Sequence, residues 1–195
     1  MAYTWPPSVA EVKLQLGKTD TTDDPELAGF IDGVVAVIEY LTGPIVSTVF
    51  TEWHDGGRDT ICPLRLPVVS VTSVTEYLGT MTYALTVVAD PSVATLYSVT
   101  VDSVTGTITR RVVGGTSCFA PGRRNIQVVY NAGFATVPPN VRWAALELVR
   151  KNWTSTQNGR GRGSGQDDGQ MLMGYFVPNN VREALMPNER LPGMA

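Results

Sequence analysis

The stretch from Ile126 to Trp153, IQVVYNAGFATVPPNVRWAALELVRKNW, changes from a strand pattern to a helix pattern. In its first part Ile126, Val128 and Tyr130 alternate with Gln127, Val129 and Asn131, which predicts a strand. Pro138-Pro139 then opens a helix with one apolar side, which carries Val141, Ala144, Ala145, Leu148 and Val149. A strand that leads into an amphipathic helix indicates that both structure types contribute to the fold.

Two further helix starts lie near the beginning of the chain. Ser8 and Glu11 have the spacing of a capping box, in which each side chain accepts a hydrogen bond from the other residue's amide. Asp24, followed by Pro25, predicts a second helix that runs to about Leu41 and ends at Gly43-Pro44. Its buried side is expected to carry Leu27, Phe30, Ile31, Val34, Val35, Ile38 and Leu41.

Between Ile45 and Tyr130 the sequence is rich in Val and Thr, and short turn sequences such as Asp55-Gly56-Gly57 divide it. This pattern predicts an antiparallel sheet or a small barrel. In residues 46–53 neither alternating face is cleanly polar. The sheet is therefore predicted to be covered on both sides or to press against a neighbouring copy.

Several features recur in a fixed order along the chain. They are a short first helix, an Asp-Asp start and Leu-Thr-Gly end of the second helix, the β run 64–74, and the YNAGF strand 130–134 that leads into VPPNV at 137–141. In this order they resemble the head-to-tail connector, or adaptor, proteins of long-tailed double-stranded DNA bacteriophages. The resemblance covers most of residues 4–186.

Together, the residue patterns and the resemblance predict an α+β fold, with a small bundle of three to four helices packed with an antiparallel β region. We expect a helical part at 1–44, the β region at 45–131, a core helix at 132–154, a flexible Gly/Arg loop at 155–170, and a C-terminal segment with a short helix at 171–195. Since the β region of related connectors is often shorter, residues of about 77–119 are expected to form an enlarged hairpin or lobe that makes contacts peculiar to this assembly.

The resemblance implies a structural virion protein that assembles in the host cytoplasm and resides at the head-to-tail interface. Its subunits would form a homo-oligomeric ring of twelve copies beneath the portal protein, extend the DNA channel, and bind a downstream head-completion or tail-terminator protein. The C-terminal part would reach towards the portal. Its candidate portal-facing residues are Tyr175, Phe176, Val181 and Leu185.

Charge is unevenly distributed along the chain, whose formal net charge is −3. Residues 1–60 hold three basic and ten acidic residues, whereas residues 103–166 hold nine basic residues and one acidic residue. This division favours attraction between copies or towards a polyanion. The candidate inter-subunit residues are Asp23 and Asp24 on one copy and Arg123 and Arg124 on the next, and the candidates for weak, sequence-independent contact with double-stranded DNA are Arg160 and Arg162.

The sequence predicts neither a cofactor nor a metal site, and we expect no enzyme activity because no convergent catalytic set is present. His54 is the sole histidine; a polar hairpin loop is favoured there over a metal-binding turn with Glu52. Cys62 and Cys118 are expected to be buried or idle thiols. No membrane-spanning run and no signal peptide are recognised, which predicts a soluble, non-secreted protein without a membrane partner.

Two other function classes stay open. A β-rich carbohydrate- or host-binding module of a virion would use Trp53, Tyr77, Tyr83 and Tyr97 as stacking residues, although core or interface positions are favoured for them. A hydrolase or nuclease is disfavoured by the missing catalytic set.

Overall fold

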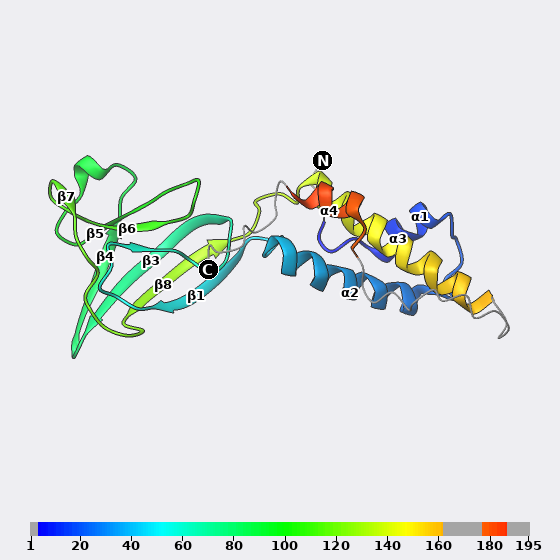
Figure 1. Ribbon diagram of the computed structural model, residues 1–195, viewed down its shortest axis with the longest axis horizontal. Helices are drawn as coiled ribbons and strands as arrows, with labels where there is room; N and C mark the ends of the chain where they lie inside the picture. Colours follow the sequence, from blue (N-terminus) through cyan, green and yellow to red (C-terminus); the bar gives the residue numbers. More distant parts are fainter. Residues whose placement is uncertain (1–3, 162–176, 187–195) are drawn as a thin grey trace. The chain divides into compact units, whose positions relative to one another are not determined.

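The computed structural model describes residues 4–161 and 177–186, with the side chains of 158–161 left aside. The chain divides into two compact units. Among the described residues, those up to Thr42 and those from Thr136 to Met186 form the helical unit, and the segment from Gly43 to Ala135 forms the β unit. Helices and a mostly antiparallel sheet are both present, which confirms the predicted α+β class (Figure 1).

The helical unit contains α1 (Val9–Leu16), α2 (Asp24–Thr42), α3 (Pro139–Gly161) and α4 (Asn179–Leu185). The predicted capping box opens α1, since the Ser8 hydroxyl accepts from the Glu11 amide at 3.3 Å and the Glu11 carboxylate accepts from the Ser8 amide at 2.9 Å. Gly43 follows α2 with φ +84°, the left-handed conformation expected of a glycine directly after a helix. Both predicted N-terminal helices are thereby confirmed.

Apolar stripes of α2 and α3 form the centre of this unit. The predicted apolar side of α3 is buried throughout, and α2 buries Leu27, Ile31, Val34 and Ile38. Phe30 meets Trp153 edge to face, with ring centroids 6.0 Å apart. Glu147 of α3 is buried, and its carboxylate accepts a hydrogen bond from Arg150 at 2.7 Å. This arginine lowers the pKa of Glu147.

The bounds of α3 differ from the predicted core helix at 132–154. The helix begins at Pro139 and continues to Gly161, so residues 155–161 are helical rather than part of a flexible loop. Residues 162–170 of that predicted loop lie outside the described residues. Elongation of an existing helix needs only one more hydrogen bond per residue, and the hydroxyls of Thr154 and Thr156 donate to carbonyls one turn back at 2.9 Å each. The predicted short C-terminal helix is present as α4.

The β unit contains eight strands in one sheet, ordered β1-β8-β3-β4-β5-β6-β2, with β7 paired to β6. The strands are β1 (Thr48–His54), β2 (Thr60–Ile61), β3 (Val68–Leu78), β4 (Met81–Val87), β5 (Ser98–Val101), β6 (Ile108–Val112), β7 (Gly115–Thr116) and β8 (Ile126–Ala132). The pairing of β4 with β5 is parallel, which corrects the expectation of a wholly antiparallel region. The 3-10 helix η1 (Pro91–Val93) lies within the connection between these two strands.

One face of the strands β1, β8, β3 and β4 packs into the core of the β unit. Ile126, Val128, Tyr130 and Ala132 alternate along β8 and are fully buried, as their spacing predicted. Residues from β2, β5 and β6 complete this core: Ile61, Val99 and Ile108. The strands at the far end of the sheet thus cover its inner face. Cys62 and Cys118 are both exposed and free, so the expectation that these thiols are buried is wrong.

Candidate interaction surfaces

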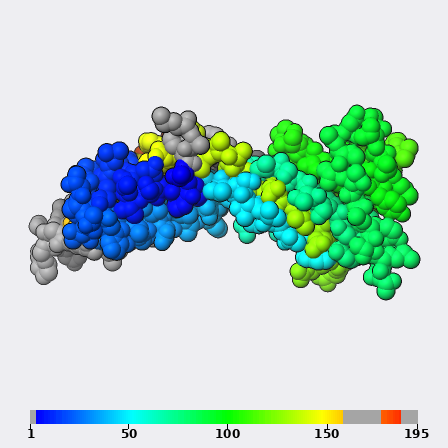
Figure 2. All heavy atoms as spheres, turned by 180° about the vertical axis from the view of Figure 1, so that it is seen from behind, coloured from blue at the N-terminus to red at the C-terminus, as the bar shows by residue number. Residues whose placement is uncertain are grey.

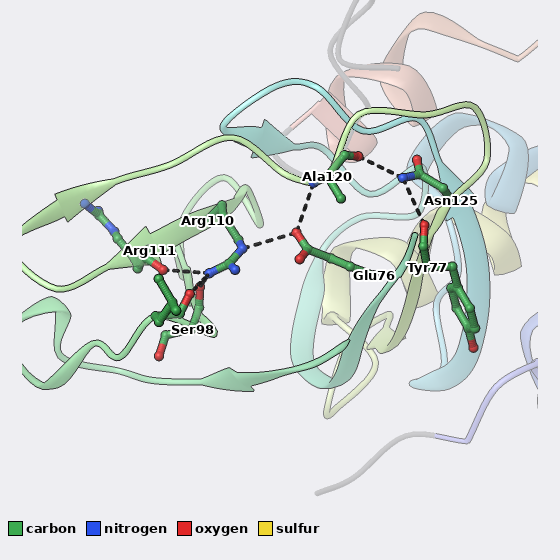
Figure 3. Close-up of polar contacts among 8 residues, drawn as sticks. Glu76, Tyr77, Ser98, Arg110, Arg111, Ala120 and Asn125 are labelled. Atoms are coloured by element: carbon green, nitrogen blue, oxygen red, sulfur yellow. Dashed lines mark hydrogen bonds and ion pairs between the residues drawn. The ribbon is translucent and has the colours of Figure 1, made fainter. Parts of the chain in front are cut away.

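A loop from Ala120 to Asn125 at one end of the β unit is held in place by the buried Glu76 and the half-buried Asn125 (Figure 3). The Glu76 carboxylate on β3 accepts a hydrogen bond from the Ala120 amide at 3.2 Å. The Asn125 side-chain amide donates to the Ala120 carbonyl at 2.8 Å and to the Tyr77 carbonyl at 3.4 Å. These bonds connect the two ends of the loop to β3. The loop is therefore a positioned feature of the β unit.

The same carboxylate anchors the part of the β unit formed by residues 77–119, which we call the lobe. Arg110 on β6 lies beside Glu76, with Nε 3.2 Å from Oε1, and both side chains are less than a tenth exposed (Figure 3). Its Nη1 atom also donates to the backbone carbonyls of Leu96, Ser98 and Arg111, at 2.8, 3.2 and 2.7 Å. A buried arginine with a carboxylate partner and three carbonyl acceptors has its charge compensated inside the protein. Arg110 is therefore an interior residue, and it does not contribute to the basic surface that the charge count of residues 103–166 implied.

Arg123 and Arg124, the predicted inter-subunit arginines, are exposed on the loop that this network holds. Arg124 has φ +48°, a left-handed conformation that is unfavourable for a residue with a side chain. Its backbone amide donates to the Asp55 carboxylate at 2.6 Å, and this bond helps to retain the conformation. Within the described residues neither arginine forms an ion pair, so both charges face solvent.

A glycine allows the neighbouring β1–β2 connection to approach this loop. The Gly56 amide donates to the Gly122 carbonyl at 2.9 Å and to the Asn125 side-chain oxygen at 3.0 Å. A Cβ atom added at Gly56 would lie 1.8 Å from the Ala120 carbonyl oxygen. Only glycine fits this close approach. The Asp55-Gly56-Gly57 sequence, predicted to be a turn, therefore also supports the loop that carries the two arginines.

Asp23 and Asp24, the predicted acidic partners, form ion pairs within their own chain. Lys18 contacts Asp23, and Lys13 lies 2.8 Å from Asp24. The hydrogen bond with Asp23 raises the pKa of Lys18. Between Lys13 and Asp32 the chain has two lysines against five acidic residues, so the surface at the start of α2 stays net acidic. Asp20 and Asp32 are exposed there.

The outer face of β1 and β8 has no covering layer in the part of the chain that the structure describes. We define the open sheet face by Val49, Thr51 and Trp53 of β1 and Gln127, Val129 and Asn131 of β8. The adjoining positions of β3 and β4 are Ser, Thr, Tyr and Ala. Figure 2 shows atoms of β8 at the surface between those of β1 and β3. The whole face is uncharged, although 17% of the chain is charged.

All four predicted stacking aromatics occur in pairs. Trp53 and Tyr77 lie on the open sheet face with ring centroids 5.3 Å apart, and Trp53 remains 41% exposed. The Tyr77 hydroxyl donates to the Gln127 side chain at 3.3 Å. Tyr83 and Tyr97 stack at 5.4 Å with nearly parallel rings on the lobe. The first pair therefore belongs to the open sheet face, and the second pair stabilises the lobe.

His54 and Glu52, the weighed alternative for a metal-binding turn, do lie together, with Nε2 and Oε2 3.2 Å apart. The Glu52 carboxylate also accepts from the Leu64 amide at 3.0 Å and from the Tyr130 hydroxyl at 2.6 Å. Burial and this carboxylate raise the pKa of Tyr130. Through these hydrogen bonds Glu52 holds the connection formed by residues 62–67 in place. Among the described residues no three potential ligands gather as a metal site would require.

Of the portal-facing candidates, Val181 and Leu185 are buried within the helical unit, at 0% and 1% exposure. Their side chains therefore contribute to its core, as two apolar residues four apart on a short helix often do. Tyr175 and Phe176 lie outside the described residues. Arg160 is in the last turn of α3, where only the backbone is described, and Arg162 lies outside the described residues.

Sequence reasoning missed Glu76 and Asn125. A signal for Glu76 was present, because it lies two positions after the buried Val74 and so on the same face of β3. An acid at a core position indicates a buried partner. Asn125, by contrast, stands in a loop sequence and has no distinguishing pattern.

Comparison with solved structures finds the same fold in two neck assemblies of gene transfer agent (GTA) particles. A chain from the neck of the empty particle, computed with C6 symmetry, is 19% identical, with a TM-score of 0.53 over 99% of this chain and 97% of that chain. A chain from the neck of the native particle, computed with C12 symmetry, is also 19% identical, with a TM-score of 0.51 and the same coverage. No protein-family model and no curated protein matches the sequence. None of the helices described is long and apolar enough to cross a membrane.

Proposed function

We propose that this chain is a structural, non-catalytic subunit of the neck of a phage-like particle, where it connects the head to the tail. The observation that carries the proposal is the fold, which nearly the whole chain shares with subunits of two neck assemblies. The order of helix starts, strands and the terminal strand-to-helix transition supports the same role. An assembly of this kind needs stable subunit surfaces rather than a reactive site.

In detail, twelve copies form a ring beneath the portal protein and extend the DNA channel. A downstream head-completion or tail-terminator protein binds the ring on its other side, and DNA passes with weak, sequence-independent contacts. The C12 symmetry of one neck assembly with the same fold supports this copy number. Ring formation needs a heterologous interface, in which two different surfaces of each copy meet and the rotation closes.

One such contact joins the exposed Arg123 and Arg124 to the acidic start of α2 in the next copy. Asp23 and Asp24 have lysine partners in their own chain, but the surface around them stays net acidic and includes the exposed Asp20 and Asp32. The arginines are held on a positioned loop and have no ion-pair partner among the described residues. Electrostatic attraction of this type guides orientation and weakens with salt.

The direct test uses purified full chain mixed with purified portal oligomers from the same particle, imaged by electron microscopy. We expect a ring of twelve subunits on one end of the portal. Particles assembled without the chain should lose their contents and fail to acquire tails. Normal tail attachment in those particles would contradict the proposed function.

The electrostatic contact has its own test. The double reversal Arg123→Glu and Arg124→Glu should reduce ring assembly at low salt, whereas Arg65→Glu with Arg111→Glu, which makes the same change in charge on other parts of the β unit, should have less effect. Equal ring yield for both variants would dismiss this contact and leave the ring itself in place.

A carbohydrate-binding module is a second candidate, and the exposed Trp53 beside Tyr77 favours it. Flat aromatic surfaces with nearby amides such as Gln127 can stack on sugar rings and accept or donate hydrogen bonds. Binding on a glycan array that Trp53→Ala abolishes would support this function. Absence of binding at millimolar oligosaccharide would remove it.

A further inference from the structure

The open sheet face requires a partner surface without charges. Val49 is 61% exposed and Trp53 41% exposed, so apolar area on this face is in contact with water. A charged group pressed against it would lose its hydration without gaining an ion-pair partner. The open sheet face therefore selects against charged surfaces, and an uncharged surface of complementary shape is the occupant that its chemistry favours.

The lobe of the same unit carries such a surface. We define the lobe tip by Val93, Leu96, Tyr97 and Val113, whose exposed fractions are 61%, 58%, 42% and 79%. Residues 91–97 and 112–122 contain no charged side chain. Since Ser98 of β5 pairs with Arg111 of β6, the segment that leads into β5 and the β6–β7 turn that carries Val113 lie at the same end of this strand pair. The two segments of the lobe tip are thus neighbours.

Two hydrogen bonds and a ring stack hold the 90–97 segment of the lobe tip. The Leu96 carbonyl accepts from the buried Arg110 guanidinium at 2.8 Å, and Tyr97 stacks on Tyr83 at 5.4 Å. Asp90 caps η1 by accepting from the Ser92 amide at 2.8 Å. An exposed apolar surface that is already ordered loses little conformational entropy when it is covered by a partner. This is the behaviour of a preorganised contact surface.

We propose that the lobe tip of one copy docks on the open sheet face of the next copy. The proposal rests on the proposed ring and identifies one of its interfaces. Both surfaces are uncharged, both expose apolar side chains, and each copy carries one of each. The contact is therefore heterologous and repeats from copy to copy around the ring. It also gives the enlarged lobe a role.

Cross-linking tests the pairing directly. In a background of Cys62→Ser and Cys118→Ser, Thr51→Cys places a thiol on the open sheet face and Val93→Cys places one on the lobe tip. A short bismaleimide should convert the double variant into a ladder of dimers, trimers and larger products, both alone at high concentration and on the purified portal. Each single variant should stay monomeric on a denaturing gel.

A second measurement uses charge. Val93→Glu and Thr51→Arg should each weaken self-association in sedimentation at least tenfold, because each would bury a charge without a partner. Val104→Glu is the matched control, since Val104 is 89% exposed but lies in the β5–β6 turn at the other end of the lobe. Its association should equal that of the unmodified chain, and circular dichroism checks that all three variants fold.

The outcomes separate this inference from the proposed function. A dimer from Thr51→Cys alone would mean that the open sheet face pairs with itself, which overturns the proposal. Rings on the portal without any ladder would overturn the interface and leave the connector function intact. Trp53-dependent glycan binding without a ladder would assign the face to carbohydrate and overturn the proposal as well.

Discussion

Replacement of Arg110 by methionine is expected to destabilise the β unit severely. Its guanidinium donates to Glu76 and to the carbonyls of Leu96, Ser98 and Arg111, and both charged side chains are buried. Arg110→Met leaves the Glu76 carboxylate with the Ala120 amide at 3.2 Å as its remaining described donor. Breaking one partner of a buried ion pair costs about 3–5 kcal/mol.

Urea unfolding followed by circular dichroism measures this cost. With an m-value of about 2 kcal/mol per molar urea, the midpoint should fall by roughly 2 M. Hydrogen exchange should locate the loss of protection in β5, β6 and residues 120–125. Arg111→Met is the matched control, because Arg111 is the next residue on β6 and its partly buried guanidinium donates to the Thr100 hydroxyl at 3.0 Å. Its cost should stay near 1 kcal/mol.

A double-mutant cycle tests whether the two charges act together. Because Glu76→Leu in the Arg110→Met background removes the unpaired acid, the double variant should be more stable than the sum of the single effects predicts, by about 1–3 kcal/mol. Equal midpoints for Arg110→Met and Arg111→Met, or strict additivity in the cycle, would refute the reasoning.

Substitutions at four further positions test local geometry and one local charge, each by urea unfolding. Gly56→Ala should destabilise the chain by about 1–3 kcal/mol, because the added Cβ would lie 1.8 Å from a carbonyl oxygen. The control is Gly29→Ala on an exposed part of α2, where the added Cβ meets nothing within 4 Å; it should stabilise the chain by about 0.5–1 kcal/mol. The opposite order of stabilities would contradict both expectations. Arg124→Gly should be more stable than Arg124→Ala by about 1 kcal/mol, since φ is +48° there, and equal stabilities would argue against strain. The Ser8 amide and Arg142 lower the pKa of Glu11 below its ordinary 4.5, so its contribution is complete above that pH and is lost as the pH falls through the lowered value. Glu11→Gln should therefore reduce stability at pH 7 by about 0.5–1 kcal/mol and show a smaller deficit at pH 3, and a deficit independent of pH would contradict this assignment.

Local signals predicted the helices well. The capping box places both partners three residues apart, so Ser8 and Glu11 meet in any helix that begins there. The same holds for Gly43, which ends α2 through its own backbone freedom. The predicted end of α3 at residue 154 was wrong. Residues 155–161 have no apolar side, and their helical structure depends on continuation from the turns before them.

The two faces of β1 show what an alternating sequence pattern cannot predict, namely which face is covered. Alternation indicated two faces, and it left open whether both were covered or one met another copy. Which layer lies opposite a face depends on strands far away in the sequence, such as β2 and β6. The parallel pairing of β4 with β5 has the same cause, since it depends on the route of the intervening connection. The strand pattern of β8, fully buried on one side, was recoverable because both its neighbours bury the same face.

The charge pattern along the sequence indicated only part of the surface charge. Counting charges divides the chain into an acidic and a basic part, but it cannot tell which charges are already paired. Arg110 and Glu76 are 34 residues apart, and their burial removes an arginine from the surface that the charge count implied. Lys13 and Lys18 similarly compensate Asp24 and Asp23. Exposure and pairing are tertiary properties, so the candidates that survive are the unpaired Arg123 and Arg124.

The two contacts proposed between copies would act differently during assembly. The contact of Arg123 and Arg124 with an acidic surface is exposed to solvent, so it is screened by salt and mainly accelerates and orients encounter. The contact of the lobe tip with the open sheet face buries uncharged groups, so it should change little with salt and should slow dissociation. Rings should then form more slowly in high salt yet persist once formed. The buried Glu76–Arg110 pair supports both contacts, because Glu76 holds the arginine loop and Arg110 holds Leu96 of the lobe tip.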